Sequence, residues 1–354
     1  MNSFGQILRL TTFGESHGPA IGGILDGVPS GFVIDEQKVK HELAQRRPGG
    51  AALGSHRNEP DEVRLLSGLF EGKTLGTPIG FIIENKDARS ADYCQLKDVY
   101  RPNHADYTYD AKYGIRDYRG GGRASARETA SRVCAGAIAL QILDKFGIEI
   151  IAYTSQIGSC TYSGDVKCQD MVYASDVRCP DAGSAAEMKA EILTAQSKGD
   201  TVGGMVTCQI YGLPPGLGEP VFDKLQARLA AAMMSLPAAK AFEYGMGVSA
   251  ASAYGSECID IFGEQADTNY SGGIQGGIST DKPLNMRVTF KPAPTLMMPM
   301  QTVDKYGEKV LLQMKGRHDA CVVPRAVSVV RAMASLTILD AVLLDRAGHL
   351  RLDV

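Results

Sequence analysis

The chain has 354 residues, of which 44% are hydrophobic and 22% charged, a composition typical of a soluble globular protein with a sizeable core. Its formal net charge of −3 argues against a general attraction to nucleic acid or to membranes. We see no apolar run of about 18 residues, the length that crosses a bilayer, and no signal-peptide core, so we expect a cytoplasmic protein without membrane contact.

In chain order, the sequence predicts a strand at 6–12, a helix over 35–46, and strands at 63–70 and 78–84. Helices are predicted over 125–146 and 184–198, a strand at 202–211, a helix over 221–236, a strand at 283–290 and a long apolar helix over 324–346. Because helices and strands come in mixed order, an α+β fold is favoured over a doubly wound parallel sheet. No low-complexity linker divides residues 1–354, so we expect a single domain.

Polar residues at the helix starts support these assignments. Asp35 is a candidate N-cap for the first helix. Ser125 and Glu128 fit a capping box, in which each side chain accepts a free backbone N–H, and Ser184 and Glu187 repeat the pattern. The sequence therefore predicts helices that begin at these serines.

The segment 101–132 concentrates positive charge. It holds seven cations and four anions, a net charge of +3, so the rest of the chain carries −6. It ends in three glycines that lead into the helix start at Ser125, with Arg123 and Arg127 on either side. A helix N-terminus offers free N–H groups, and arginine binds phosphate or carboxylate with two parallel hydrogen bonds. The pattern therefore predicts capture of a small molecule with several negative charges.

Two alternatives remain open for the segment 101–132. It could be a solvated charged loop without a ligand. It could also bind RNA, because tyrosines alternate with arginines and Tyr-Arg-Gly-Gly-Gly-Arg resembles an RGG element. The single occurrence of this element and the nearby aspartates argue against RNA.

Further candidates lie outside this segment. His17 follows the first strand between two glycines, where it is available for proton transfer. Its neighbour Ser16 completes a formal Gly-x-Ser-x-Gly pattern, which keeps a serine hydrolase as an alternative. Residues 291–295 could offer a cation and a hydroxyl to a phosphate, or form a rigid turn. No metal site is predicted, because the cysteines form no CxxC pair and the histidines lack helically spaced partners.

Six segments together resemble chorismate synthases, and they occur in the family's order: 14–18, 46–49, 101–107, 118–128, 272–279 and 315–321. The resemblance implies a lyase of the shikimate pathway, which makes aromatic amino acids. Its substrate would be 5-enolpyruvylshikimate-3-phosphate (EPSP), which loses phosphate by anti 1,4-elimination to give chorismate. Reduced flavin mononucleotide (FMN) would be required without net redox change, and NADPH is a candidate reductant. The resemblance also implies a homotetramer and a β-α-β sandwich, with a helical layer between antiparallel sheets.

The resemblance also implies roles for individual residues. His17 would be a general acid toward the leaving phosphate, His104 would interact with the reduced flavin near N1, and Asp319 would help to move the C6 proton through flavin N5. Ser16 and Ser125 would support this relay. Substrate would be held by Arg46, Arg127 and Arg317, and Arg46 would also contact NADP if it is used. The FMN site would comprise Arg123, Ala124, Ser125, Ala238, Gly276, Lys291, Pro292, Ala293, Pro294, Thr295 and Arg317. Residues uncommon in the family stand at Ala52, Ala124, Pro237 and Pro294.

Overall fold

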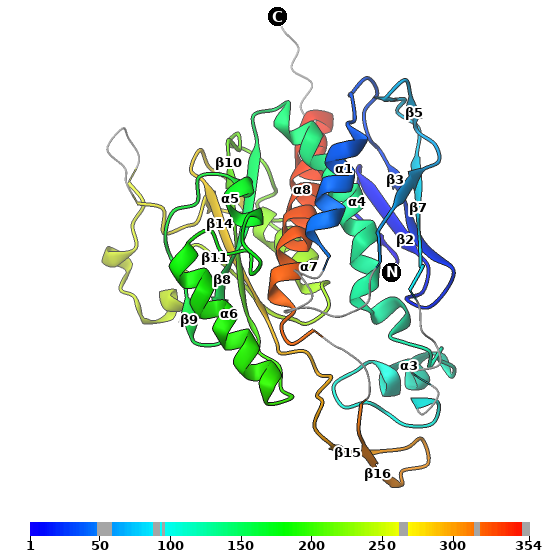
Figure 1. The fold of residues 1–354 in the computed structure, drawn as a ribbon. Coiled ribbons are helices and arrows are strands. Elements are labelled where there is room, and N and C mark those ends of the chain that lie inside the picture. Colours follow the sequence, from blue (N-terminus) through cyan, green and yellow to red (C-terminus); the bar gives the residue numbers. More distant parts are fainter. Residues whose placement is uncertain (48–58, 88–92, 94–95, 262–267, 315–318, 349–354) are drawn as a thin grey trace, which may run out of the picture.

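Two five-stranded antiparallel sheets face each other across a layer of helices (Figure 1). The structure is a computed structural model that describes residues 1–47, 59–87, 93, 96–261, 268–314 and 319–348. The first sheet has the order β1 (Ser3–Phe4), β2 (Arg9–Phe13), β3 (Ala20–Asp26), β7 (Ile79–Glu84) and β4 (Val63–Leu65). The second has the order β11 (Ala239–Tyr244), β14 (Leu284–Phe290), β10 (Gly204–Tyr211), β8 (Glu149–Ile157) and β9 (Cys160–Thr161). The predicted α+β sandwich is confirmed.

Four helices fill the space between the sheets. α4 (Thr129–Asp144) packs against β2, β3 and β7, and α8 (Val323–Gly348) packs against β8 and β10. α1 (Glu36–Gln45) contacts α4 and α8, and α7 (Leu225–Met234) contacts α8 and β11. α4 and α8 approach closely at Gly136, where an added Cβ would lie 2.4 Å from the Cβ of Ala332. This position therefore needs glycine.

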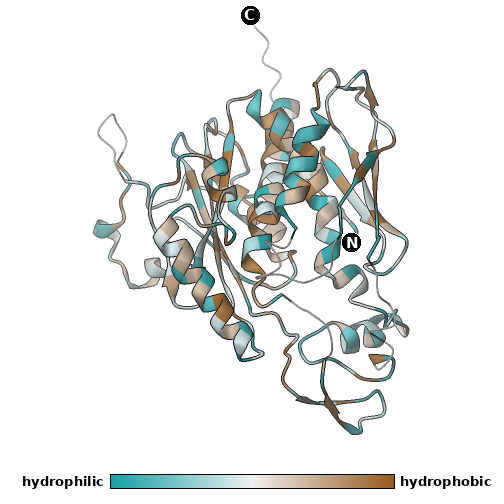
Figure 2. Cartoon of the chain, in the orientation of Figure 1, coloured by the Kyte–Doolittle hydropathy of each residue, from teal (hydrophilic) through white to brown (hydrophobic). Residues whose placement is uncertain are grey.

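α8 is apolar on nearly every side because it touches neighbours on every side. By length and composition it could cross a membrane, so our expectation that no segment reaches this threshold was wrong. However, 83% of its most apolar window is buried inside the molecule, as in the core helix of a soluble protein. Figure 2 shows brown, apolar residues along the strands and central helices, and teal residues on α1 and the outer loops.

The helix starts differ from the predicted capping boxes. Asp35 caps α1 as expected and accepts from Gln37 N at 2.8 Å. Ser125 instead begins a 3₁₀ turn, η3 (Ala126–Glu128), that precedes α4. Glu128 does not return a bond to Ser125, because its carboxylate is engaged by side chains from other elements. α6 (Ala182–Ser197) is capped by Asp181 rather than Ser184.

The remaining elements surround this framework. α5 (Gln169–Tyr173) packs on β8, and α6 packs on β8 and β9 (Figure 1). α3 (Asp106–Tyr113), β15 (Met300–Val303) and β16 (Lys309–Leu312) lie together beyond one end of the sandwich (Figure 1). The described residues also form two short hairpins, β5 (Leu69–Phe70) with β6 (Lys73–Thr74) and β12 (Ile274–Gln275) with β13 (Ile278–Ser279). They form three further 3₁₀ turns: η2 (Gly122–Ala124), η4 (Gly247–Ser252) and η5 (Gly255–Glu257).

Candidate active site

A large pocket opens at the end of the sandwich where α4 and α8 begin and where α1 and α7 end. Its cavity volume is about 1090 Å³. Pockets for small ligands span roughly 300–1,000 Å³, so this cavity lies at the upper end of that range. The N-termini of the long helices α4 and α8 also place positive dipole ends at its wall.

Most of the predicted site residues converge on this pocket. Its lining includes Arg46, His104, Arg123, Ala124, Ser125, Arg127, Ala238, Lys291, Ala293, Pro294, Thr295 and Asp319. Pro292 is not part of the lining, and neither is Gly276, which lies in the turn between β12 and β13. Arg317 and Ala52 lie outside the described residues.

His17 lies directly behind one wall of the pocket. Its Nδ1 is 3.0 Å from Ser16 Oγ, and its ring meets the edge of Tyr93 at a centroid distance of 4.9 Å. A Cβ added to Gly120 would lie 2.2 Å from His17 Nδ1, and both Gly120 and Tyr93 line the pocket. The imidazole is therefore separated from the cavity at this point by little more than a glycine backbone.

His104 is held in one tautomer by two hydrogen bonds. Nδ1 lies 2.9 Å from Pro102 O, and Nε2 lies 3.1 Å from Thr295 Oγ1. Because a carbonyl only accepts, Nδ1 carries the proton, and Nε2 of the neutral ring accepts from the Thr295 hydroxyl. Burial, and next the positive charge of Arg101, lower the pKa of His104 to about 4. The ring is therefore neutral at pH 7 and offers a lone pair toward Thr295.

Asp61 links the two described arginines that were predicted to bind substrate. Its Oδ2 accepts from Arg46 Nη1 at 3.2 Å, and its Oδ1 pairs with Arg127 Nη1. All three side chains are at most 3% exposed. Burial, and next Arg325, lower the pKa of Arg46 to about 9, while Asp61 raises it. Arg46 thus remains a cation at neutral pH.

Additional hydrogen bonds fix the direction of these two guanidinium groups. Arg46 donates to Thr129 Oγ1 at 2.9 Å and to Ala126 O at 2.6 Å. Arg127 donates to Asn85 Oδ1 at 2.8 Å. Asp61 was not among the residues predicted from the sequence, although its place in the acidic segment Glu59-Pro60-Asp61-Glu62 could have drawn attention to it.

A second ion pair stands at the start of α8. Asp319 pairs with Arg325 Nη1, and Arg325 Nε donates to Arg46 O at 3.2 Å. Arg325 was also missed. Its place in the first turn of a predicted helix, six residues after Asp319, could have drawn attention to it.

Every arginine of the segment 101–132 contacts a carboxylate among the described residues. Arg101 forms a bidentate pair with Asp106, with distances of 2.8 and 2.7 Å, and Arg116 contacts Asp106 at 3.2 Å. Arg119, the most exposed arginine of the segment at 51%, pairs with Asp117. Arg123, Arg127 and Arg132 lie within 4.0 Å of Glu128, Asp61 and Glu128, respectively. The segment therefore builds the pocket wall instead of presenting free cations to solvent.

The net charge of the pocket lining suits anionic ligands. Nine arginines and lysines and seven aspartates and glutamates line the pocket, a difference of +2. Arg47 lines it too, and its Nε is buried without a hydrogen-bond partner in the described structure, so it has a donor available for an acceptor. Among the described residues, no cluster of three His, Cys, Asp or Glu side chains could hold a metal ion.

Comparisons with known proteins point to one family. The family model of chorismate synthase matches residues 8–343. A chorismate synthase of Bacteroides thetaiotaomicron is 54% identical over 99% of both chains, and one of Phocaeicola vulgatus is 52% identical over the same shares. A crystal structure of chorismate synthase superposes with a TM-score of 0.77 at 31% identity, covering 96% of this chain and 93% of that one.

Proposed function

The chain belongs to the chorismate synthase family, and on this premise we propose that it converts EPSP to chorismate by anti 1,4-elimination of phosphate. The reaction would use reduced FMN without net redox change, and the enzyme would be a cytoplasmic carbon–oxygen lyase of the shikimate pathway. The observation that carries this proposal is the convergence of Arg46, Arg123 and Arg127 with His104 on one large cavity. Substrate and cofactor both carry phosphate, which explains why so many guanidinium groups meet there.

Arg46 and Arg127 would hold the substrate's anionic groups. Both are fixed by Asp61 before any ligand arrives, so they need little reorganisation when charge builds on the departing phosphate. Fixed cations of this kind stabilise the transition state more than the ground state. His17, with its Nδ1 beside Ser16 Oγ, would donate a proton toward the leaving phosphate.

A second part of the lining would hold the cofactor. This wall would comprise Arg123, Ser125, Ala238, Lys291 and residues 293–295, with Lys291 as a further cation. Reduced FMN, when bound there, would supply an electron transiently to the reacting substrate.

Two further residues of the lining would handle protons. His104 would hold a proton at Nε2 next to an anionic ligand, whose charge would raise its pKa. Asp319, fixed by Arg325, would help to move the proton that leaves C6.

The RNA-binding alternative has less support. The arginines of the segment 101–132 are engaged by carboxylates, and all but Arg119 line the pocket.

We also propose that the protein is a homotetramer and that NADPH, which would contact Arg46, is the reductant of the flavin.

The test is phosphate release from EPSP by the purified protein with anaerobically reduced FMN, with chorismate measured in parallel. Absence of both products with well-folded protein would overturn the proposal. His17→Ala should lower turnover by roughly 10²–10⁴-fold if His17 is a general acid. His41→Ala is the matched control, because His41 is an exposed histidine on α1 that does not line the pocket.

A further inference from the structure

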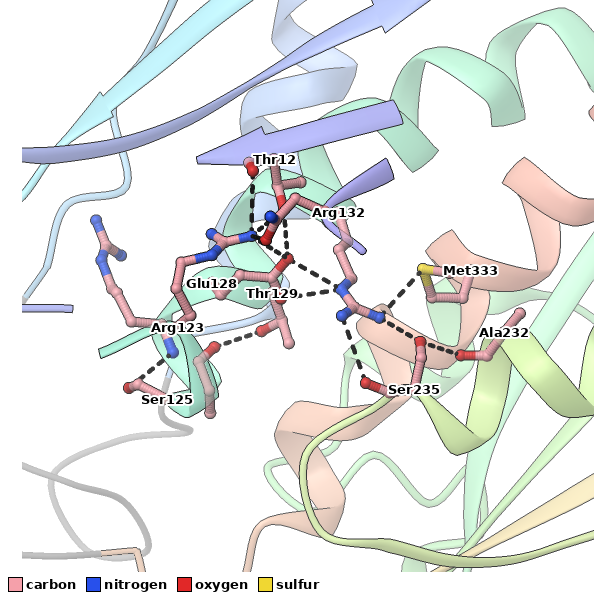
Figure 3. Close-up of polar contacts among 12 residues, drawn as sticks. Thr12, Arg123, Ser125, Glu128, Thr129, Arg132, Ala232, Ser235 and Met333 are labelled. Carbon is pink, nitrogen blue, oxygen red and sulfur yellow. Dashed lines mark hydrogen bonds and ion pairs between the residues drawn. The ribbon is translucent and has the colours of Figure 1, made fainter. Parts of the chain in front are cut away.

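Glu128 links β2 to α4 through its two carboxylate oxygens (Figure 3). Its side chain is 6% exposed. Oε1 accepts from Thr12 Oγ1 at 2.9 Å, and Oε2 accepts from Arg132 Nε at 2.9 Å. One buried carboxylate thus contacts a strand of the first sheet and a helix of the central layer.

The first arm orients Arg123. Thr12 Oγ1 accepts from Arg123 Nη2 at 2.6 Å, and Thr12 O accepts from the same nitrogen at 3.1 Å. Because the ionised Glu128 can only accept, the Thr12 hydroxyl must donate to it, which leaves the oxygen lone pairs free for Arg123. Glu128 therefore orients the hydroxyl that accepts the shortest hydrogen bond of Arg123, which also donates to Gly14 O at 3.3 Å.

The second arm holds the turn after α7. Arg132 Nη1 donates to Ser235 Oγ at 2.6 Å and approaches Met333 Sδ at 3.8 Å. Ser235 is the C-cap of α7, and it is followed by Pro237 and Ala238, which line the pocket. Ala238 has a φ of +68°, which is costly for a residue with a side chain, so external contacts must maintain this turn.

From this geometry we propose that Glu128 is a positioning residue for the cofactor wall, one that sets Arg123 and the Pro237–Ala238 turn relative to each other without contacting the flavin itself. The proposal rests on the proposed function, which places FMN at this wall. A purely structural carboxylate would stabilise the fold, but it would have no selective effect on flavin affinity.

Glu128→Gln tests the arrangement because glutamine has one acceptor oxygen and one donor NH₂. If the NH₂ faces Arg132, two donors meet. If it faces Thr12, the hydroxyl turns its hydrogen toward Arg123. In the first case Arg132 Nε keeps only its longer contact, 3.3 Å to Oε1, and in the second the bond that orients the Thr12 hydroxyl is lost. Either rotamer therefore weakens one of the two contacts, and the Kd for FMN should rise roughly tenfold.

Glu42→Gln is the matched control. Glu42 is also a largely buried carboxylate, 12% exposed, that binds an arginine and a hydroxyl, Arg331 and Tyr173. It does not line the pocket. Glu42→Gln should reduce the free energy of unfolding but leave the Kd for FMN unchanged.

The measurement is isothermal titration of oxidised FMN into each protein in the presence of EPSP, with thermal unfolding of each variant in parallel. A Kd for Glu128→Gln within threefold of the wild type would overturn the inference, and so would an equal rise in both variants. If the wild type binds no FMN, the proposed function itself fails. In kinetics, the KM for flavin should rise more than kcat falls.

Ser235→Ala keeps the test decisive if Glu128→Gln does not fold. It removes the hydroxyl at the far end of the second arm and leaves Glu128 ionised and bound to Thr12. A several-fold weaker FMN affinity with near-normal unfolding supports the inference. An unchanged FMN affinity would show that the contact from Arg132 to Ser235 does not position the cofactor wall, and it would overturn the inference that Glu128 acts on both sides.

Discussion

Asp61→Asn is the substitution that most directly tests how the two substrate arginines are held. Asp61, Arg46 and Arg127 are all at most 3% exposed, so the interaction is scarcely screened by solvent. Removing one partner of a buried ion pair typically costs about 3–5 kcal/mol, because the remaining charge is left unpaired. In this case two guanidinium groups would lose the carboxylate between them.

This loss of unfolding free energy corresponds to a measurable fall in Tm. With an unfolding entropy of about 2.1 cal/mol/K per residue, the 354-residue chain has about 0.74 kcal/mol/K, so Tm should fall by about 4–7 °C. Differential scanning calorimetry at pH 7 measures it. Inorganic phosphate should raise the Tm of Asp61→Asn more than that of the wild type, because an anion between the arginines replaces part of the lost charge.

Asp117→Asn provides the comparison. Asp117 pairs with Arg119 at 2.8 Å, but the two side chains are 32% and 51% exposed. Exposed pairs contribute about 0–1 kcal/mol, so this variant should melt within about 1–2 °C of the wild type. If Asp61→Asn melts no lower than Asp117→Asn, Asp61 does not hold the arginines as described.

Gly120→Ala should lower turnover nearly as much as His17→Ala, since its Cβ would lie 2.2 Å from His17 Nδ1 and must displace the ring; normal turnover with an intact fold would contradict this. The pKa of His104 is about 4 in the folded chain and about 6.5 in the unfolded chain, so the unfolded chain binds the proton first as the pH falls. The stability due to neutral His104 is therefore complete above about pH 6.5 and is lost toward pH 4. Over this range, denaturant titrations should show a steeper loss for the wild type than for His104→Gln. Asp340→Asn should destabilise the fold, because Asp340 is fully buried, accepts three backbone N–H groups of the N-terminal segment and pairs with Arg228; an unchanged midpoint of chemical unfolding would contradict this.

Local sequence patterns predicted helices well where contacts within the segment itself decide its structure. α1 has the expected cap at Asp35 and buries Val39 and Leu43 on one face, as its spacing indicated. The capping box at Ser125 was wrong for a tertiary reason. Glu128 could bond to the Ser125 backbone or to Thr12 and Arg132, and the distant partners prevailed because one of them is charged.

The site was predictable only in part. Resemblance predicted Arg46, Arg123, Arg127 and His104, and the structure brings them to one pocket. It did not predict Asp61, because the contacts of a short acidic loop depend on where the rest of the fold places it. The roles of these residues, the FMN-binding role of Gly276 and the single domain stay predictions, and Arg317 lies outside the described residues.

The place of α8 in the chain has a consequence for biosynthesis. α8 follows every strand of both large sheets in the sequence, yet it lies between those sheets and packs on β8 and β10. While the ribosome is still translating residues before 323, the faces of β8 and β10 that α8 will cover are exposed to the aggregation that threatens apolar surface. Closure of the sandwich must therefore wait until α8 has been made, and a nascent chain stalled before it would be a natural client for chaperones.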